Sequence, residues 1–377
     1  MSNPVQTHYQ LYPYPEYPLF ASVRRSDTYA INLNALWCRF NSSLPPVSVK
    51  KILLAGCGTF SPYPWSLANP DSEITALDLS ERSLKRARLH CLLHGRRNVT
   101  YQCGDLLDNA DEPGEFGLID SYGVLHHLDD PLSGLKALEA RLVSGGILRI
   151  MVYSRYARRD EESIRRALRL LKVSEPLKVR RLLAKAEGGS RLAHYLASSC
   201  EAKSEAGIAD ALLHPKVHTF RIRELMDMIR QTSLEPLLFA HQDALVNIQE
   251  EVERVQTLEK ERSSPGNFVL YLGRNISPAD RNPEKSMIML NPCLTDAVSR
   301  FSLRPPHIPP RTGHENPPLG RSERSFLRQF ITPVRRGELC SDAAETVDAY
   351  KLALFLVEYL VDSTPHRVYF PSTQKTS

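Results

Sequence analysis

Short apolar segments alternate with helix-forming segments between residues 50 and 149, and this alternation constrains the fold more than any other feature of the chain. Buried strands are expected at 52–55, 74–77, 99–101, 117–119 and 147–153, with helices at 83–94 and 131–142. Such alternation is typical of a parallel sheet covered by helices on both faces. Further strands at 234–239 and 267–272 extend the prediction to a doubly wound, Rossmann-like α/β sheet of seven strands.

The segments outside this sheet predict a chain in three parts. Residues 1–45 form an N-terminal segment, irregular to residue 26 because prolines crowd the stretch 12–18, and then helical over 27–40. Residues 46–275 form the main domain, with extra helices at 222–231 and 248–262 and a helical insertion at about 155–213. Residues 276–377 form a C-terminal extension with a proline-rich linker at 304–318 and a terminal helix at 343–361.

Composition bounds the class of protein. The chain has 377 residues, a formal net charge of +5 and seven cysteines, none of which belongs to a Cys-x-x-Cys pair. Scattered cysteines suit a reducing compartment and predict no metal site. The first residues lack the apolar core of a signal peptide, and the most apolar stretch, 352–361, is too short to span a bilayer. These observations predict a soluble, cytoplasmic protein without a membrane partner.

The first chemical motif is a glycine turn directly after a predicted strand. Gly56 and Gly58 follow the apolar residues 52–55, and glycines at this place let a ligand approach the backbone. Asp78 ends the second predicted strand, where a carboxylate can accept hydrogen bonds from the ribose of a nucleoside cofactor. The alternatives are a plain strand-to-helix turn and a helix cap at Asp78. A nicotinamide dinucleotide is disfavoured, because Ser61 replaces the third glycine of its phosphate-binding turn.

Three more motifs follow in order along the chain. They are Gly104-Asp105-Leu106 after the third strand, IDSYGVLHHL at 119–128 after the fourth, and LVSGGIL at 142–148 before the fifth. In order and spacing the motifs resemble the class I S-adenosylmethionine-dependent methyltransferases, strongly over about residues 50–155 and more weakly to about residue 273. The residues at 55–59, 77–84, 123–128, 153–159 and 210–220 are similar to a bacterial subgroup that is often fused to tetratricopeptide repeats.

The resemblance implies S-adenosylmethionine as the cofactor and assigns nine residues to it. These are Gly56, Cys57, Gly58, Asp78, Leu79, Asp105, Leu106, Tyr122 and Gly123. The glycine turn would line the methionine part, Asp78 would hold the ribose, and the two leucines and Asp105 would hold adenine. The Tyr122–Gly123 pair would lie beneath the transferring methyl. Phe60 departs from the family, whose members usually carry glycine there, and its bulk predicts crowding at the mouth of the site.

Two histidines are candidate catalytic residues. His126 and His127 follow the fourth strand, at the edge of the sheet where ligands of open α/β folds bind. An imidazole with a pKa near neutrality can act as a general base for a nucleophile that must lose a proton. The alternative is that they pack in the loop or cap the next helix. His214 and His218 are expected to be structural, because Pro215 between them opposes the helix that would pair them as metal ligands.

The predicted function is in-line transfer of a methyl group to an unidentified acceptor, either a small molecule or a protein side chain. An amide or adenine amino nitrogen is disfavoured, because the Asn/Asp-Pro-Pro-aromatic segment that holds such groups is absent after the fourth strand. The alternative function is a catalytically silent scaffold whose C-terminal region binds a protein partner, an alternative that Phe60 favours.

Two segments leave their roles open. Residues 155–191 contain twelve Lys or Arg but only five Asp or Glu, and we interpret this basic run as the solvated face of helices. Nucleic acid is disfavoured there because residues 159–191 contain no interleaved aromatic residues for base stacking. The tyrosine–proline segment at 12–18 is expected either to fold over the site, with Tyr14 or Tyr17 contributing to it, or to wrap another face of the domain.

Overall fold

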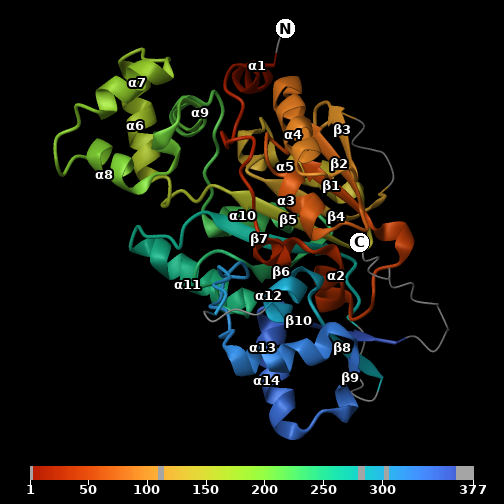
Figure 1. The fold of residues 1–377 in the computed structure, drawn as a ribbon. Coiled ribbons are helices and arrows are strands. Elements are labelled where there is room, and N and C mark those ends of the chain that lie inside the picture. Colours follow the sequence, from red (N-terminus) through yellow and green to blue (C-terminus); the bar gives the residue numbers. More distant parts are fainter. Residues whose placement is uncertain (1–2, 109–113, 279–284, 301–304, 362–377) are drawn as a thin grey trace.

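A central seven-stranded sheet organises the computed structural model, which describes residues 3–108, 114–278, 285–300 and 305–361 (Figure 1). The strands lie in the order β3-β2-β1-β4-β5-β7-β6. Their bounds are β1 Lys51–Ala55, β2 Glu73–Asp78, β3 Val99–Cys103, β4 Phe116–Tyr122, β5 Leu142–Val152, β6 Leu234–Phe239 and β7 Phe268–Arg274. The predicted seven-stranded α/β sheet is confirmed, but it is mixed, because β7 runs antiparallel to both β5 and β6.

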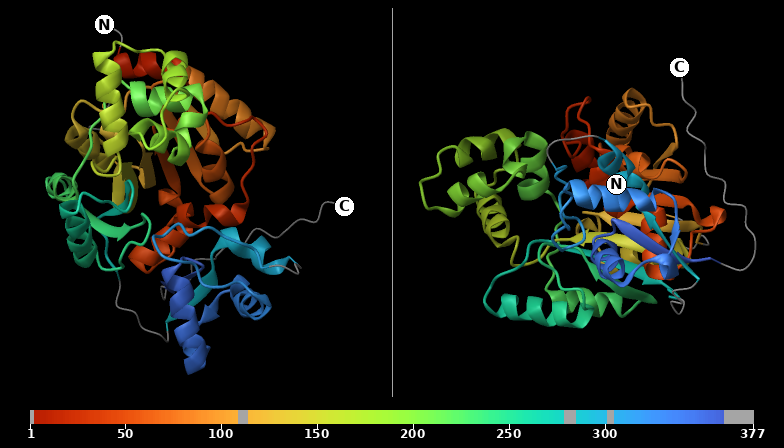
Figure 2. Two further views of the ribbon diagram at one scale, coloured as in Figure 1. Left: turned by 90° about the vertical axis from the view of Figure 1, so that its left-hand side faces the viewer. Right: turned by 60° about the horizontal axis from the view of Figure 1, so that its bottom comes forward.

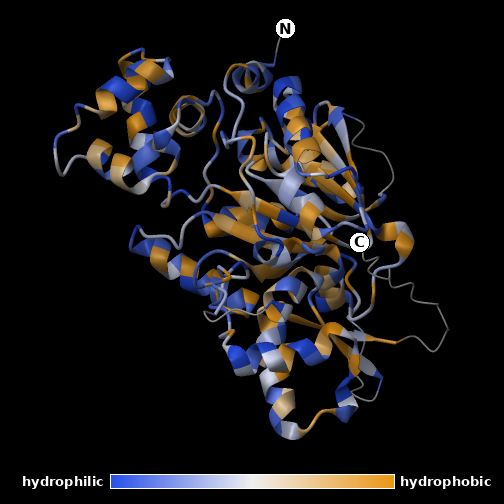
Figure 3. Cartoon of the chain, in the orientation of Figure 1, coloured by the Kyte–Doolittle hydropathy of each residue, from blue (hydrophilic) through white to orange (hydrophobic). Residues whose placement is uncertain are grey.

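Helices cover both faces of this sheet, as predicted. One face carries α2 Leu33–Asn41, α3 Pro62–Ala68 and α4 Glu81–Leu93, and the other carries α5 Pro131–Ala140, α10 Ile222–Ile229 and α11 Ile248–Lys260. Successive residues of β1 serve opposite cores: Ile52 and Leu54 pack in the first, and Leu53 and Ala55 in the second. Figure 3 shows the resulting concentration of hydrophobic residues on the central strands.

The part of the chain that follows β5 and precedes β6 includes a helical lobe, which projects from the sheet (Figures 1 and 2). It comprises α6 Arg159–Leu170, α7 Pro176–Leu183, α8 Arg191–Ser198, α9 Glu205–Ile208 and a π-helical turn, Ala209–Leu213. The lobe packs around its own small core, which includes Ile164, Leu168, Val179 and Tyr195. It occupies the stretch expected to be a helical insertion.

The N-terminal segment differs from the prediction. Residues Pro4–Leu11 form a helix, α1, although the whole stretch to residue 26 was expected to be irregular. The prolines that oppose a helix come only after residue 12, whereas Pro4 occupies the first turn, where it is tolerated, and Asn3 caps the helix through Val5. The helix expected over 27–40 is interrupted: Arg25–Ile31 is a 3₁₀ segment, and Asn32 caps α2.

The C-terminal part forms a second sheet, in the order β10-β8-β9, with strands β8 Ser286–Leu290, β9 Val334–Arg335 and β10 Leu356–Leu360. It is flanked by α12 Thr295–Ser299, α13 Arg321–Arg328 and α14 Ser341–Leu352. The terminal helix expected over 343–361 is therefore wrong beyond residue 352, because residues 356–360 pair antiparallel with β8. Residue 304 of the expected linker and residues 362–377 lie outside the described part; residues 305–318 form neither helix nor strand.

Helix α2 joins the two sheets. Leu36 and Trp37 of α2 belong to the same buried core as Phe355 and Val357 of the C-terminal part. The backbone NH of Leu360 donates to the carbonyl of Ser42 at 2.8 Å, just past the end of α2. Among the described residues, no helix combines the length and apolar character needed to cross a membrane.

Candidate active site

A cavity of about 540 Å³ opens at the carboxyl ends of β1, β2 and β4. This is the point where the strand order reverses between β1 and β4, which is where open α/β sheets bind their ligands. The structure brings all nine predicted cofactor residues to the wall of this one cavity. They are Gly56, Cys57, Gly58, Asp78, Leu79, Asp105, Leu106, Tyr122 and Gly123.

The backbone of the glycine turn leaves no room for side chains at Gly56 and Gly58. Gly56 and Gly58 have φ angles of 73° and 58°, in the left-handed region. A β-carbon at Gly56 would lie 2.3 Å from a methyl of Val124, and one at Gly58 would lie 2.6 Å from the carbonyl oxygen of Tyr14. Both positions therefore require glycine, as expected for a turn that the rest of the site approaches closely.

Asp78 is tied to the glycine turn by its side chain. Its Oδ2 accepts a hydrogen bond from the NH of Gly58 at 2.7 Å, and its Oδ1 accepts from the NH of Ser80 at 2.8 Å. The cap of α4 is the side chain of Ser80, which accepts from Ser83, so helix capping does not account for Asp78. Burial raises the pKa of this carboxyl. Each oxygen keeps a lone pair that can receive a ribose hydroxyl.

The side of the cavity where the resemblance puts adenine combines apolar walls with one carboxylate. Leu79 and the buried Leu106 supply the walls, and Asp105 lies beside them with its Oδ1 held by the NH of Leu107 at 3.0 Å. A planar apolar ring with an amino edge suits such a surface. The donor set, the glycine cradle and the cavity volume thus fit S-adenosylmethionine.

The N-terminal segment forms part of the cavity wall, so the first of its two expected paths is correct. Tyr14 and Tyr17 both line the cavity, and the carbonyl of Tyr14 accepts from the NH of Thr59 at 3.1 Å. Phe60 packs on the ring of Tyr17 at 4.4 Å and on His90 at 5.0 Å, between centroids. Phe60 is therefore part of the wall that holds this segment, beside a cavity that stays large enough for a cofactor.

The two candidate catalytic histidines occupy different environments. His127 lines the cavity, whereas His126 is fully buried behind it, with its ring stacked on Tyr153 at 3.7 Å. Burial lowers the pKa of His127 to about 3 and that of His126 well below its usual value. The prediction of a near-neutral pKa is wrong for both, because the loop that carries them is covered by Tyr153 and His214.

Two further histidines, His214 and His8, pack against His127 or against each other, whereas His218 is exposed. His214 stacks on His127 at 3.7 Å and hydrogen-bonds the carbonyl of Lys216 through Nδ1. His8 of α1 packs on His214 at 4.8 Å. Within the described ranges, no group of three or more His, Cys, Asp or Glu is arranged to hold a metal ion.

Two residues of the cavity wall, Tyr9 and Asp210, form a pair that has no role in the sequence-based prediction. The Tyr9 hydroxyl of α1 donates to Oδ1 of Asp210 at 2.8 Å, and both residues line the cavity. Asp210 lies in the π-helical turn, a rare geometry that often marks functional sites. It is only 3% exposed, and burial raises its pKa to about 6. The segment 210–220 was noted as a motif, but spacing alone could not pair it with residue 9.

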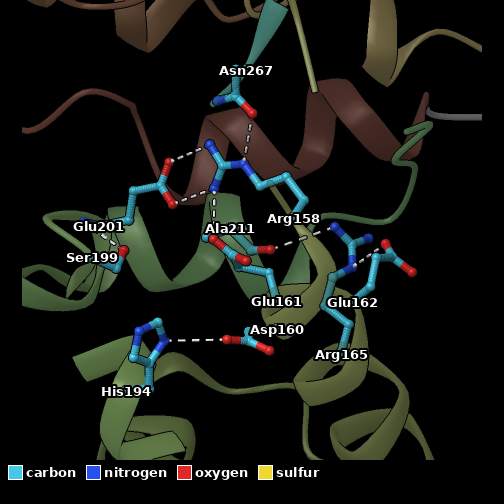
Figure 4. Close-up of polar contacts among 10 residues, drawn as sticks. All are labelled: Arg158, Asp160, Glu161, Glu162, Arg165, His194, Ser199, Glu201, Ala211 and Asn267. Carbon is cyan, nitrogen blue, oxygen red and sulfur yellow. Dashed lines mark hydrogen bonds and ion pairs between the residues drawn. The ribbon is translucent and has the colours of Figure 1, made fainter. Parts of the chain in front are cut away.

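Arg158 is the second such group: it belongs to the motif at 153–159, but the sequence-based prediction includes no role of its own for it. Its guanidinium binds both carboxylate oxygens of Glu201, at 2.8 and 3.2 Å, and also contacts Glu161 at 3.2 Å (Figure 4). Its Nε donates to Asn267 at 3.3 Å, just before β7, and it lies 3.9 Å from the centroid of the Tyr153 ring. Arg158 thereby ties the helical lobe to the edge of the cavity.

Comparison with known proteins shows which proteins this chain is similar to. Residues 53–148 match the family described as "Methyltransferase domain". An uncharacterized protein of Synechococcus sp. is 28% identical, with 96% of this chain and 92% of that protein covered. The ubiquinone biosynthesis O-methyltransferase of Idiomarina loihiensis is 38% identical over 98 residues, which is 26% of this chain and 40% of that enzyme. The chain thus spans less than half the length of the O-methyltransferase that it matches.

Solved structures agree on the fold. PKMT2 from Rickettsia typhi aligns with a TM-score of 0.56 at 16% identity, covering 93% of this chain and 78% of that one. Its complex with AdoHcy aligns with a TM-score of 0.54 at 14% identity, covering 91% and 77%. The family match, the strand order and the cavity where that order reverses agree that the chain carries a class I S-adenosylmethionine-dependent methyltransferase domain, matched over residues 53–148, with S-adenosylmethionine as its cofactor.

Proposed function

We propose that this enzyme methylates an amino group, with Asp210 accepting the proton that the amine must lose. The observation that carries the proposal is the Tyr9–Asp210 pair, held at 2.8 Å at the cavity wall. When bound, S-adenosylmethionine supplies a methyl group that its sulfonium makes electrophilic. The nine cofactor residues are proposed to keep the roles that the family resemblance assigns to them.

The charge of the cavity supports a cationic acceptor. Five carboxylates line it, from Asp78, Asp105, Asp129, Glu201 and Asp210, against two cations, Arg158 and Lys216. Both cations are already engaged, Arg158 by Glu201 and Lys216 by Asp129. Tyr9, Tyr14 and Tyr153 also line the cavity. Carboxylates and aromatic rings together favour a positively charged ligand over a neutral one.

Proton transfer follows from the same arrangement. An ammonium group beside ionised Asp210 is attracted to it, but an ammonium group also near a sulfonium has its pKa lowered by the like charge. The proton passes to Asp210, whose raised pKa makes it a stronger base than an ordinary carboxylate. The nitrogen lone pair would then be free to accept the methyl group that bound S-adenosylmethionine would supply, with S-adenosylhomocysteine as the product that leaves.

The two histidines have a smaller part in this proposal. His127 forms part of the wall and is kept neutral by its lowered pKa, so it adds no positive charge against the acceptor. His126 supports Tyr153 from behind through ring stacking.

A hydroxyl acceptor is the second candidate, favoured by the names of the matched ubiquinone biosynthesis O-methyltransferases. Those matches cover only 26% and 30% of this chain. Asp210 can also deprotonate a hydroxyl, so the base is common to both candidates.

The experiment has two stages. Calorimetric titration with S-adenosylmethionine should show one binding site, and the absence of binding would favour the silent scaffold instead. The enzyme is then incubated with methyl-labelled cofactor and either n-alkylamines or substituted phenols, and S-adenosylhomocysteine release is measured. Release with amines alone supports the proposal, and release with phenols alone supports the hydroxyl candidate.

A further inference from the structure

The consecutive helices α6 and α7 carry an unusual excess of positive charge on the outside of the helical lobe. Between residues 166 and 185 there are seven Lys or Arg and a single acidic residue, Glu175. All seven of the basic residues are exposed. Glu175 is already paired with Lys178 at 2.6 Å. Nearly all of the exposed charge on residues 166–185 is therefore positive.

Six of these cations have no partner of their own. Over the described residues, the side chains of six members make neither an ion pair nor a hydrogen bond: Arg166, Arg169, Lys172, Arg180, Arg181 and Lys185. An ordinary solvated helix usually balances its charges with i,i+3 or i,i+4 pairs. The absence of such pairs leaves the charge available to a ligand.

Exposed leucines lie among these cations. Leu170 is 79% exposed and Leu171 65% exposed at the end of α6, and Leu177 is 50% exposed at the start of α7. The core of the lobe is formed by other residues of the same helices, including Leu168, Val179 and Leu183, so these three leucines are not part of it. Figure 3 shows hydrophobic and hydrophilic residues mixed along this lobe, which stands clear of the sheet.

We propose that this surface, formed by residues 166–185, docks on an anionic phospholipid bilayer. Aliphatic side chains that enter the acyl boundary, surrounded by Lys and Arg that meet the headgroups, form the pattern of helices that lie in a membrane interface. A nucleic-acid surface fits less well, because residues 166–185 contain no Phe, Tyr or Trp to stack on bases and leucines gain nothing there.

The proposed binding is peripheral. Helices α6 and α7 have 12 and 8 residues, so they lie on a bilayer and do not cross it. The sequence alone led to a solvated face and no membrane partner; the exposed leucines and the unpaired cations are what the structure adds. The proposal is independent of the acceptor and of the methyl-transfer chemistry.

The test uses the full chain and sedimentation with vesicles of phosphatidylcholine alone or with about one third phosphatidylglycerol. We expect binding only to the anionic vesicles, with affinity falling as salt rises. Arg166→Gln with Arg181→Gln should weaken binding about tenfold or more, since each basic residue near such a surface strengthens binding several-fold. Leu170→Asn with Leu171→Asn should weaken it without changing the salt dependence.

Matched controls separate this surface from general stickiness. Leu245→Asn with Val246→Asn replaces an exposed apolar pair elsewhere, and Arg321→Gln with Arg335→Gln removes two exposed charges from the C-terminal part. Both controls should bind vesicles like the parent, and calorimetry with S-adenosylmethionine should show all variants folded. Equal binding to neutral vesicles, no binding at all, or binding to single-stranded polynucleotide in place of vesicles would each overturn the proposal.

Discussion

The Tyr9 hydroxyl donates a 2.8 Å hydrogen bond to the carboxylate of Asp210, although 201 positions separate the two residues in the chain. Helix α1 brings one partner from the N-terminal segment, and the π-helical turn brings the other from the helical lobe. The part of the cavity where we propose that the acceptor binds is therefore built by segments outside the central sheet, whereas the turns at the strand ends build the part proposed for the cofactor.

Replacing the proposed base should separate chemistry from cofactor binding. We expect Asp210→Asn to lower kcat by about 100-fold or more, because the amide cannot accept the proton. The affinity for S-adenosylmethionine should change less than threefold, since Asp210 is not among the nine cofactor residues. Tyr9→Phe keeps the carboxylate and should cost far less. A kcat unchanged in Asp210→Asn would rule out its role as base.

The pH dependence of the reaction should report the same carboxyl. Burial raises the pKa of Asp210 to about 6, and only its ionised form accepts a proton. We therefore expect kcat/KM to fall as pH drops below about 6 and to level off above it. The limb should disappear from the residual activity of Asp210→Asn. If the limb persists in that variant, it belongs to another group.

Asp78 should control the affinity for the cofactor. Asp78→Asn removes charge and acceptor capacity at the ribose position, and we expect the Kd for S-adenosylmethionine to rise at least tenfold, about 1.4 kcal/mol. Asp71→Asn changes a carboxylate paired with Lys50 outside the cavity and should leave Kd unchanged. Equal titrations for parent and Asp78→Asn would contradict the assignment.

Two glycines in the same backbone region allow strain to be separated from crowding. Gly58 and Gly95 have φ angles of 58° and 66°, but a β-carbon meets the Tyr14 carbonyl at Gly58 and open space at Gly95. Gly95→Ala should cost about 1 kcal/mol of unfolding free energy from backbone strain alone. Gly58→Ala should cost more and also displace the N-terminal segment. Urea unfolding of both variants measures the difference. Equal losses of unfolding free energy would mean that the backbone at Tyr14 shifts away from the new β-carbon without cost.

Acid should destabilise the fold through the buried histidines. Burial lowers the pKa of His8 to about 4 and that of His127 to about 3, from an ordinary value of 6.5. Between pH 6.5 and 4 these two histidines bind protons in the unfolded chain but not in the folded chain, so their contribution to the unfolding free energy falls as pH falls. The slope is about 1.4 kcal/mol per pH unit for each group. His8→Gln should reduce it, and Lys185→Gln should not.

The sheet, and the gathering of the nine candidate cofactor residues at one cavity, could be predicted because local rules determine them. The alternation of apolar segments indicates the strands, and Gly56 and Asp78 end two of them at one edge. The Tyr9–Asp210 contact could not be predicted, because it depends on how the helical lobe and α1 pack against each other. The prediction of a near-neutral pKa for His126 and His127 was wrong for the same reason, because their burial depends on how distant segments pack. At the C-terminus, residues 356–360 form a strand only because β8 lies beside them.

Helix α2 is covered on one side by the main sheet and on the other by the C-terminal part, with Leu33, Leu36 and Trp37 all buried. Shortening the chain after residue 275 would place part of that apolar surface in water. A shortened protein would then need detergent or a substitute covering to stay monodisperse. Crystallisation or screening work should keep residues 285–361 even where only methyl transfer is of interest.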